Sequence, residues 1–141
     1  MANTQGVSGA AKQAALAAVV DGKTLKAALY LASATTGPTN AAYTATGELA
    51  ATGNYTAGGA SETNGNSAGL TGTTAYWTPS ASISWSNLTS SGAFDAAMIY
   101  STTDSNRNIG VFTFGSQSVT AGNFSLTMPT NDASTGLVRF A

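Results

Sequence analysis

The chain has 141 residues, enough for one domain, and only 8% of them are charged, against about 25% in ordinary soluble domains. Its few basic residues are scattered and its formal net charge is −1, which argues against the clustered Lys and Arg that bind nucleic acid. The absence of cysteine and histidine excludes disulfides, thiolate nucleophiles and the Ser-His-Asp relay. We therefore expect no enzymatic activity, no cofactor and no nucleic-acid partner.

The first residues predict an arm followed by a helix. Residues 1–9, MANTQGVSG, are small and polar, so we expect a flexible N-terminal arm there. Residues 10–20, AAKQAALAAVV, favour a helix with Ser8 as its N-cap and a stop at residues 21–22, Asp-Gly. The apolar run in this helix is far shorter than the roughly 20 residues of a bilayer span, so we expect no membrane partner.

The next segment changes to a strand pattern and then becomes polar. Residues 24–33 alternate between apolar and other side chains in the manner of a β-strand. A long Gly/Thr-rich loop region follows at about residues 34–73, and loops of this length usually carry function or disorder. We expect local order in it around Tyr43, Leu49 and Tyr55, with a short strand at 48–51.

Within this region, residues 47–59 read GELAATGNYTAGG and have the look of a phosphate-binding loop. Such a loop needs Lys and Ser/Thr after its second glycine, but Gly59 and Ala60 stand at those positions. No helix pattern follows either. The glycines are therefore predicted to make turns, with Tyr55 as an anchor and Glu48 as the one carboxylate, packed on the chain's own sandwich or on a neighbouring subunit.

The C-terminal half is rich in strand signals. Aromatic and β-branched residues alternate with polar ones in residues 73–79, 82–88, 96–102, 109–115, 122–129 and 136–141. A hairpin turn is expected at DSNRN, residues 104–108. About seven short strands joined by polar turns predict a mainly all-β fold: a single antiparallel β-sandwich or jelly-roll-like domain over residues 10–141, with one short N-terminal helix.

Three groups of residues could carry chemistry, and each has a simpler explanation. Glu48 and Glu62 could form a glycosidase-like carboxylate pair, but solvated loop residues explain them better. Residues 104–108 offer Asp and Asn at the spacing of a weak calcium loop without its terminal Glu, so a hairpin turn is preferred and we expect no metal. Tyr76 and Trp77 could stack on a sugar, but core or interface packing is the preferred explanation for them and for Trp85.

The order of the motifs resembles that of small virion structural proteins of tailed bacteriophages, often met as capsid decoration (cement) proteins. The helix is followed by LKAALYLAS, then GE and GNYTAGG, then AYWTPSASISWSNLT and FDAAMIY, then IGVFTFGSQSVTAGNFSLTMP and a terminal LVRF. The resemblance covers most of residues 12–141. It implies β-sandwich or jelly-roll-like subunits bound symmetrically over a capsid lattice.

The resemblance leads us to expect a cement protein that binds the outer surface of the major capsid protein and stabilises the shell. Its partners would be the major capsid protein and further copies of the chain, which would form a dimer or trimer. The protein would be made in the host cytoplasm and would lie on the capsid surface of the virion. The expected contact residues are Asn3, Thr4, Gln5, Val7, Glu48, Tyr55, Leu137, Arg139 and Phe140. The alternative is a receptor- or glycan-binding module on a tail or head fibre.

Overall fold

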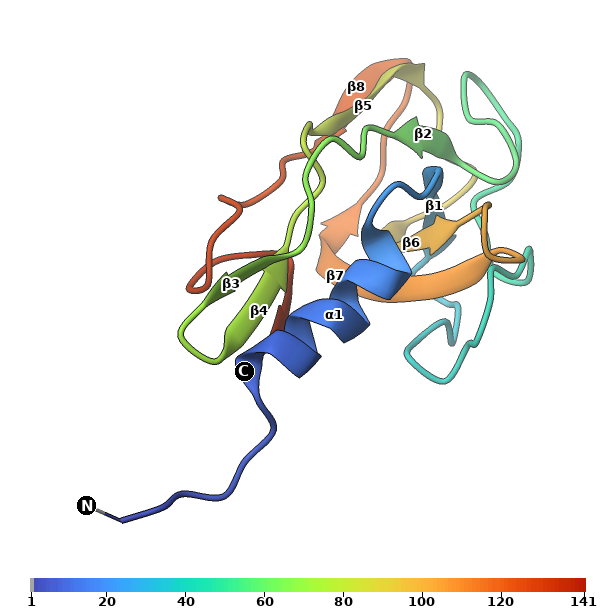
Figure 1. Cartoon of the computed structure of the whole chain (residues 1–141). Coiled ribbons are helices and arrows are strands. Elements are labelled where there is room, and N and C mark those ends of the chain that lie inside the picture. Colours follow the sequence, from blue (N-terminus) through green and yellow to red (C-terminus); the bar gives the residue numbers. More distant parts are fainter. Residues whose placement is uncertain (1) are drawn as a thin grey trace.

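The computed structural model describes residues 2–141, and its secondary structure is 38% strand and 9% helix. The strands pair in antiparallel fashion and one short helix precedes them (Figure 1). The expected mainly β, sandwich-like fold is therefore confirmed. The elements are α1 (Gly9–Val20), β1 (Leu25–Leu31), β2 (Ala60–Glu62), β3 (Gly69–Thr71), β4 (Thr74–Trp77), β5 (Ile83–Leu88), β6 (Phe94–Ser101), β7 (Arg107–Gln117), β8 (Gly122–Leu126) and β9 (Val138–Phe140).

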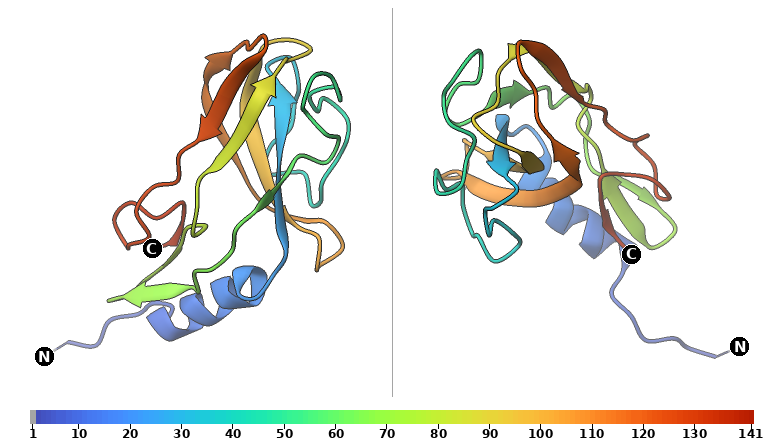
Figure 2. Two further views of the ribbon diagram at one scale, coloured as in Figure 1. Left: turned by 90° about the horizontal axis from the view of Figure 1, so that it is seen from above. Right: turned by 180° about the vertical axis from the view of Figure 1, so that it is seen from behind.

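The strands form three sheets. The largest has four strands in the order β2-β1-β6-β7, a second pairs β3, β4 and β9, and a third pairs β5 with β8. The two smaller sheets and α1 lie on one side of the large sheet (Figure 2). The large sheet puts β7 at one edge and the short β2 at the other.

The main core fills the space between the large sheet and the elements that face it. Leu29 of β1 and Ile99 of β6 are almost fully buried there, and Trp77 of β4 and Trp85 of β5 belong to the same cluster. The predicted alternation of 82–88 is confirmed, because Ile83 and Trp85 are buried whereas the intervening serine is exposed. Both tryptophans are thus core residues, as the sequence favoured.

Helix α1 forms where it was predicted. The side chain of Ser8 accepts a hydrogen bond from the backbone N–H of Ala11, and Asp21 is the C-cap. A left-handed Gly22 with φ of 67° then turns the chain. Leu16 and Val20 are buried and dock the helix on the core. Packing of this apolar side, rather than the short helix alone, accounts for its stability.

The loop region is more ordered than the sequence indicated. It contains two strands that were not predicted, β2 and β3, whereas the strand expected at 48–51 is reduced to a single bridge between Glu48 and Tyr30. Both strands are only three residues long, ASE and GLT, so they carry little strand signal of their own and depend on their partners. The first residue of the expected arm, Met1, lies outside the described residues.

The loop also covers the outer face of the large sheet. A second cluster of buried residues lies on that face, with Tyr30, Met98 and Tyr100 at its centre. The ring of Tyr43 from the loop stacks on Tyr100 with a centroid distance of 4.7 Å. Strand β1 is consequently buried on both faces, although alternation in its sequence indicated two different environments.

Candidate interaction surface

The N-terminal arm is exposed along its whole described length. Residues 2–8 are exposed, extend away from the body beside β3 and the C-terminal end (Figures 1 and 2), and carry no charged side chain. The expected contact residues Asn3, Thr4, Gln5 and Val7 all lie in it. Val7 is 65% exposed, and the other large apolar side chain classed as exposed within residues 2–141 is Phe140. An exposed, uncharged segment of this kind can be buried without removing ions from water.

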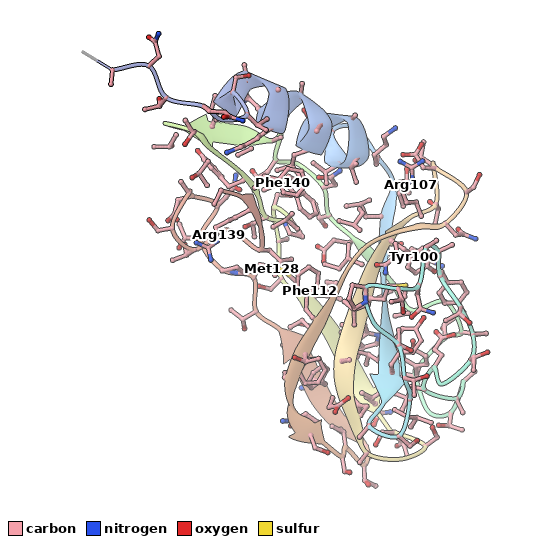
Figure 3. The ribbon with its side chains drawn as sticks, turned by 90° about the horizontal axis from the view of Figure 1, so that it is seen from below. Tyr100, Arg107, Phe112, Met128, Arg139 and Phe140 are labelled. Atoms are coloured by element: carbon pink, nitrogen blue, oxygen red, sulfur yellow. The ribbon has the colours of Figure 1, made fainter. Side chains whose placement is uncertain are left out.

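The C-terminal end supplies the second exposed group. Strand β9 pairs with β4, which sets Arg139 opposite Tyr76 and Phe140 opposite Ala75. Leu137 packs against the main core and its N–H donates to the Thr78 hydroxyl at 2.9 Å. Arg139 is exposed and Phe140 is 40% exposed. Both side chains are labelled in Figure 3. Of these three expected contact residues, Arg139 and Phe140 are exposed to solvent, whereas Leu137 packs against the core and holds the strand end in place.

The loop at 47–59 packs on its own sandwich. The Glu48 carboxylate accepts hydrogen bonds from the hydroxyls of Tyr43 and Tyr55, and from the N–H of Gly58 at 2.7 Å. The Tyr55 hydroxyl also accepts the N–H of Leu29 at 2.9 Å, and its side chain is only 3% exposed. Of the two expected alternatives, the structure shows the loop packed on its own sandwich, with Tyr55 as the anchor. A contact of Glu48 and Tyr55 with a neighbouring subunit stays a prediction.

This arrangement completes the edge of β1. Strand β2 pairs with β1 only as far as Ala27. Beyond Ala27 the 47–59 loop supplies the backbone hydrogen-bond partners of this edge: the N–H of Leu49 donates to the carbonyl of Leu29, and the N–H of Leu31 donates to the carbonyl of Gly47. Burial, together with the nearby Glu48 charge, raises the pKa of Tyr30 to about 12 and also raises the pKa of Tyr100. These tyrosines are therefore neutral hydrogen-bond donors at physiological pH, which suits a structural loop.

The two glutamates of the proposed glycosidase pair are not brought together. Glu62 is opposite Leu25 and Glu48 is opposite Tyr30 along β1. Because successive side chains of a strand alternate between faces, the two carboxylates lie on opposite faces of the sheet and about 17 Å apart along it. A glycosidase pair needs a separation of roughly 5–10 Å on one side.

The other chemical candidates have structural roles. Asp104, in the proposed calcium loop, forms an ion pair with Lys23 at 3.1 Å, and the β6–β7 hairpin turn is confirmed there by the left-handed Ser105 and Asn106. Trp77 is fully buried, so the Tyr76–Trp77 sugar platform does not form. Within residues 2–141 no three acidic side chains gather in a group that could hold a metal ion.

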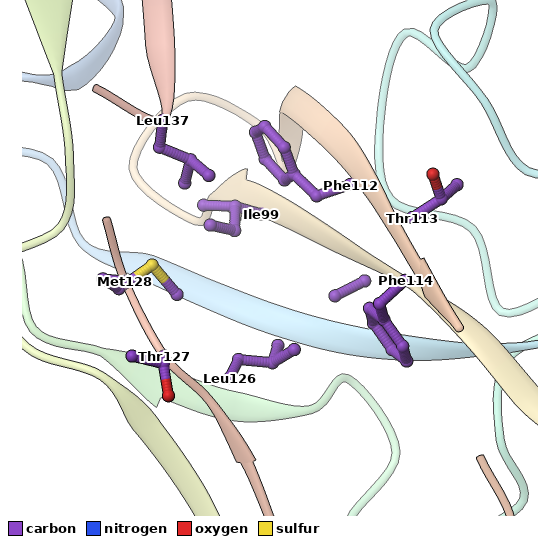
Figure 4. A pocket seen from close by; sticks show the side chains of 9 residues that line it. Ile99, Phe112, Thr113, Phe114, Leu126, Thr127, Met128 and Leu137 are labelled. Carbon is purple, nitrogen blue, oxygen red and sulfur yellow. The ribbon is translucent and has the colours of Figure 1, made fainter. Parts of the chain in front are cut away.

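A groove that the sequence did not predict lies between β7 and β8. It consists of two adjoining hollows with volumes of about 180 Å³ and about 520 Å³. The side chains of Phe114, Leu126 and Thr127 line both hollows. Figure 4 shows the smaller hollow, with Ile99 and Phe112 on one side and Met128 on the other. Phe112, Phe114 and Leu126 stay partly exposed along it. Both strands show ordinary alternation, so nothing local to either sequence reveals that they do not pair with each other.

The described helix, α1, is too short and not apolar enough to cross a membrane. Comparison of the chain with protein-family models, curated proteins and solved structures found no match.

Proposed function

We propose that this chain is a bacteriophage capsid decoration (cement) protein, which binds the outer surface of the major capsid protein lattice and stabilises the shell. The observation that carries the proposal is an uncharged arm that extends from a β-sandwich body. The motif order described above supports it as well. The body is held together by its own core, so the arm and the C-terminal end are free to make contacts with neighbours.

The low charge of the chain suits such a role. Only 8% of the residues are charged, and burying an ion against a neighbour costs several kcal/mol unless it is paired. A surface of small hydroxyl and methyl groups can be covered at little cost in desolvation. Val7 and Phe140 then supply exposed apolar groups for burial between subunits.

The expected contacts are the arm, through Asn3, Thr4, Gln5 and Val7, and the strand end, through Arg139 and Phe140. Glu48 and Tyr55 contribute indirectly by holding the 47–59 loop. The alternative of a receptor- or glycan-binding module finds no support in the tryptophans, because both are in the core. We expect binding without chemistry, since the carboxylates lie apart.

The test is to compare phage particles that lack this chain with complete particles. Particles without it should lose genome at a lower temperature and survive osmotic shock less well, because contacts between capsid subunits are missing. Adding the purified chain should restore resistance. A control protein of equal size from an unrelated source should not. Equal resistance with and without the chain would overturn the proposal.

A further inference from the structure

The β-sandwich is open along one side, and the opening lies between β7 and β8. These strands follow one another through the turn at 118–121 but do not form a hairpin ladder, because β7 pairs with β6 and β8 pairs with β5. They meet instead through side chains: the rings of Phe114 and Phe124 lie 5.5 Å apart. The two hollows of the groove occupy the space between them.

The outer edge of β7 is covered only at its beginning. Ala42 bridges to Arg107, and the N–H of Asn108 donates to the carbonyl of Ala41. From Ile109 to Gln117 the described residues place no further strand on this edge. An edge of this length presents unpaired backbone N–H and C=O groups, which are a template for another strand.

We propose that the N-terminal arm of a second copy of this chain inserts into the groove and pairs with the outer edge of β7. The arm is extended at Ser8, with φ of −64° and ψ of 145°, and is exposed throughout residues 2–8. Six residues of strand span about 20 Å, which matches the stretch of β7 from Phe112 to Gln117. The arm leaves its own body on the side of β3, away from β8 (Figures 1 and 2), so the groove that it fills belongs to another copy.

The polarity of the arm matches the groove when the arm runs antiparallel to β7. In a strand, Asn3, Gln5 and Val7 face the same way. The hollow at the Phe112 end is lined mainly by apolar groups, among them Ile99 and Met128 (Figure 4). The hollow at the opposite end adds the amides of Gln117 and Asn123.

This register sets Val7 opposite Phe112, with its isopropyl group in the apolar hollow. Asn3 then lies beside Ser116, near the amides, in the part of β7 where the register against β6 shifts between Thr113 and Gln117. Every residue that lines the two hollows is uncharged, as is every side chain of residues 2–8. Insertion therefore desolvates no ion. Because the arm and the groove are different surfaces, two copies can exchange arms reciprocally and close as a dimer, or arms passed in one direction can form a ring or a chain of subunits.

Disulfide trapping tests the partner and the direction together, since the native chain has no cysteine. Four single variants are made: Val7→Cys, Asn3→Cys, Phe112→Cys and Ser116→Cys. Chains mixed as Val7→Cys with Phe112→Cys, or as Asn3→Cys with Ser116→Cys, should form covalent dimers under mild oxidation. The crossed mixtures should not, because four residues of strand separate the sulfurs by about 13 Å. Equal or preferred linkage in the crossed mixtures, or no linkage in any, would overturn the proposal.

Mass in solution gives the second readout. Sedimentation of the full chain should show multiples of 14.0 kDa. Deletion of residues 2–7, which keeps the Ser8 cap, should give only the monomer of the shortened chain. Val7→Glu should also give the monomer. Ala11→Glu is the matched control, because it adds the same charge at an exposed position in the first turn of α1 and should leave the oligomer intact. A full chain that stays monomeric, or an oligomer unchanged by Val7→Glu, would refute the exchange of arms. This outcome does not bear on capsid binding, which the particle experiment tests separately.

Discussion

Replacing Tyr55 with Phe removes one oxygen atom and tests how the 47–59 loop is held. In the native chain this hydroxyl accepts the N–H of Leu29 at 2.9 Å and donates to Glu48 at 2.7 Å. Leu29 lies beyond the end of the β2 pairing, so its N–H loses its acceptor when the hydroxyl is gone. A buried N–H without a partner costs about 1–3 kcal/mol, and a hydrogen bond to a charged group contributes about 1.5–3 kcal/mol.

The two losses overlap, because Glu48 keeps its bonds from Tyr43 and Gly58. We therefore expect Tyr55→Phe to lower the free energy of unfolding by about 2–3 kcal/mol. Urea unfolding followed by tryptophan fluorescence measures it, since both tryptophans are buried. Tyr76→Phe is the matched control, because the Tyr76 hydroxyl makes no hydrogen bond within residues 2–141; it should change stability by less than about 0.5 kcal/mol. Equal stability of the two variants would refute this account of the loop.

Two further variants test other parts of the fold. Gly59 has φ of 81°, and a Cβ there would lie 1.8 Å from the carbonyl oxygen of Ala27, so Gly59→Ala should prevent soluble folding. The control Gly22→Ala, with φ of 67° and open space around it, should lower the free energy of unfolding by only about 1 kcal/mol, measured by thermal unfolding. Soluble, stable Gly59→Ala protein would show that β1 and the loop are not in contact. Burial raises the pKa of Glu62 from 4.5 to about 7, despite the opposing hydrogen bond from the Thr63 N–H. The folded chain then binds the Glu62 proton more tightly than the unfolded chain. The stability gained from protonated Glu62 is therefore fully present below pH 4.5 and is lost as pH rises through about 7. Relative to Glu62→Gln, the native chain should lose at most about 3 kcal/mol between about pH 4 and pH 8, and parallel stability profiles would contradict the assignment.

Much of the fold could be predicted because its signals are local. Ser8 and residues 21–22 bound the helix through capping chemistry, and the alternation of residues 82–88 needs only a sheet with one buried face. The strands of the C-terminal half were therefore placed to within a few residues. The hairpin turn at 104–108 depends on local backbone preferences and was predicted for the same reason.

The parts that were missed depend on distant partners. Strand β2, residues 60–62, exists because the edge of β1 is available to it, and its own three-residue sequence, Ala-Ser-Glu, carries no strand pattern. The hydrogen bonds of Glu48 could not be predicted, because the hydroxyls of Tyr43 and Tyr55 reach its carboxylate only in the folded loop. The groove arises from the choice of β6 and β5 as partners for β7 and β8, and pairing choices are not encoded in either strand alone.

The most direct test of the central claim is a cryo-EM reconstruction of the virion to which this chain belongs. Our account predicts density for its β-sandwich at repeated, symmetry-related positions on the outer surface of the major capsid protein lattice. Density confined to the tail or fibres, or no density for the chain on the shell, would contradict the proposed function.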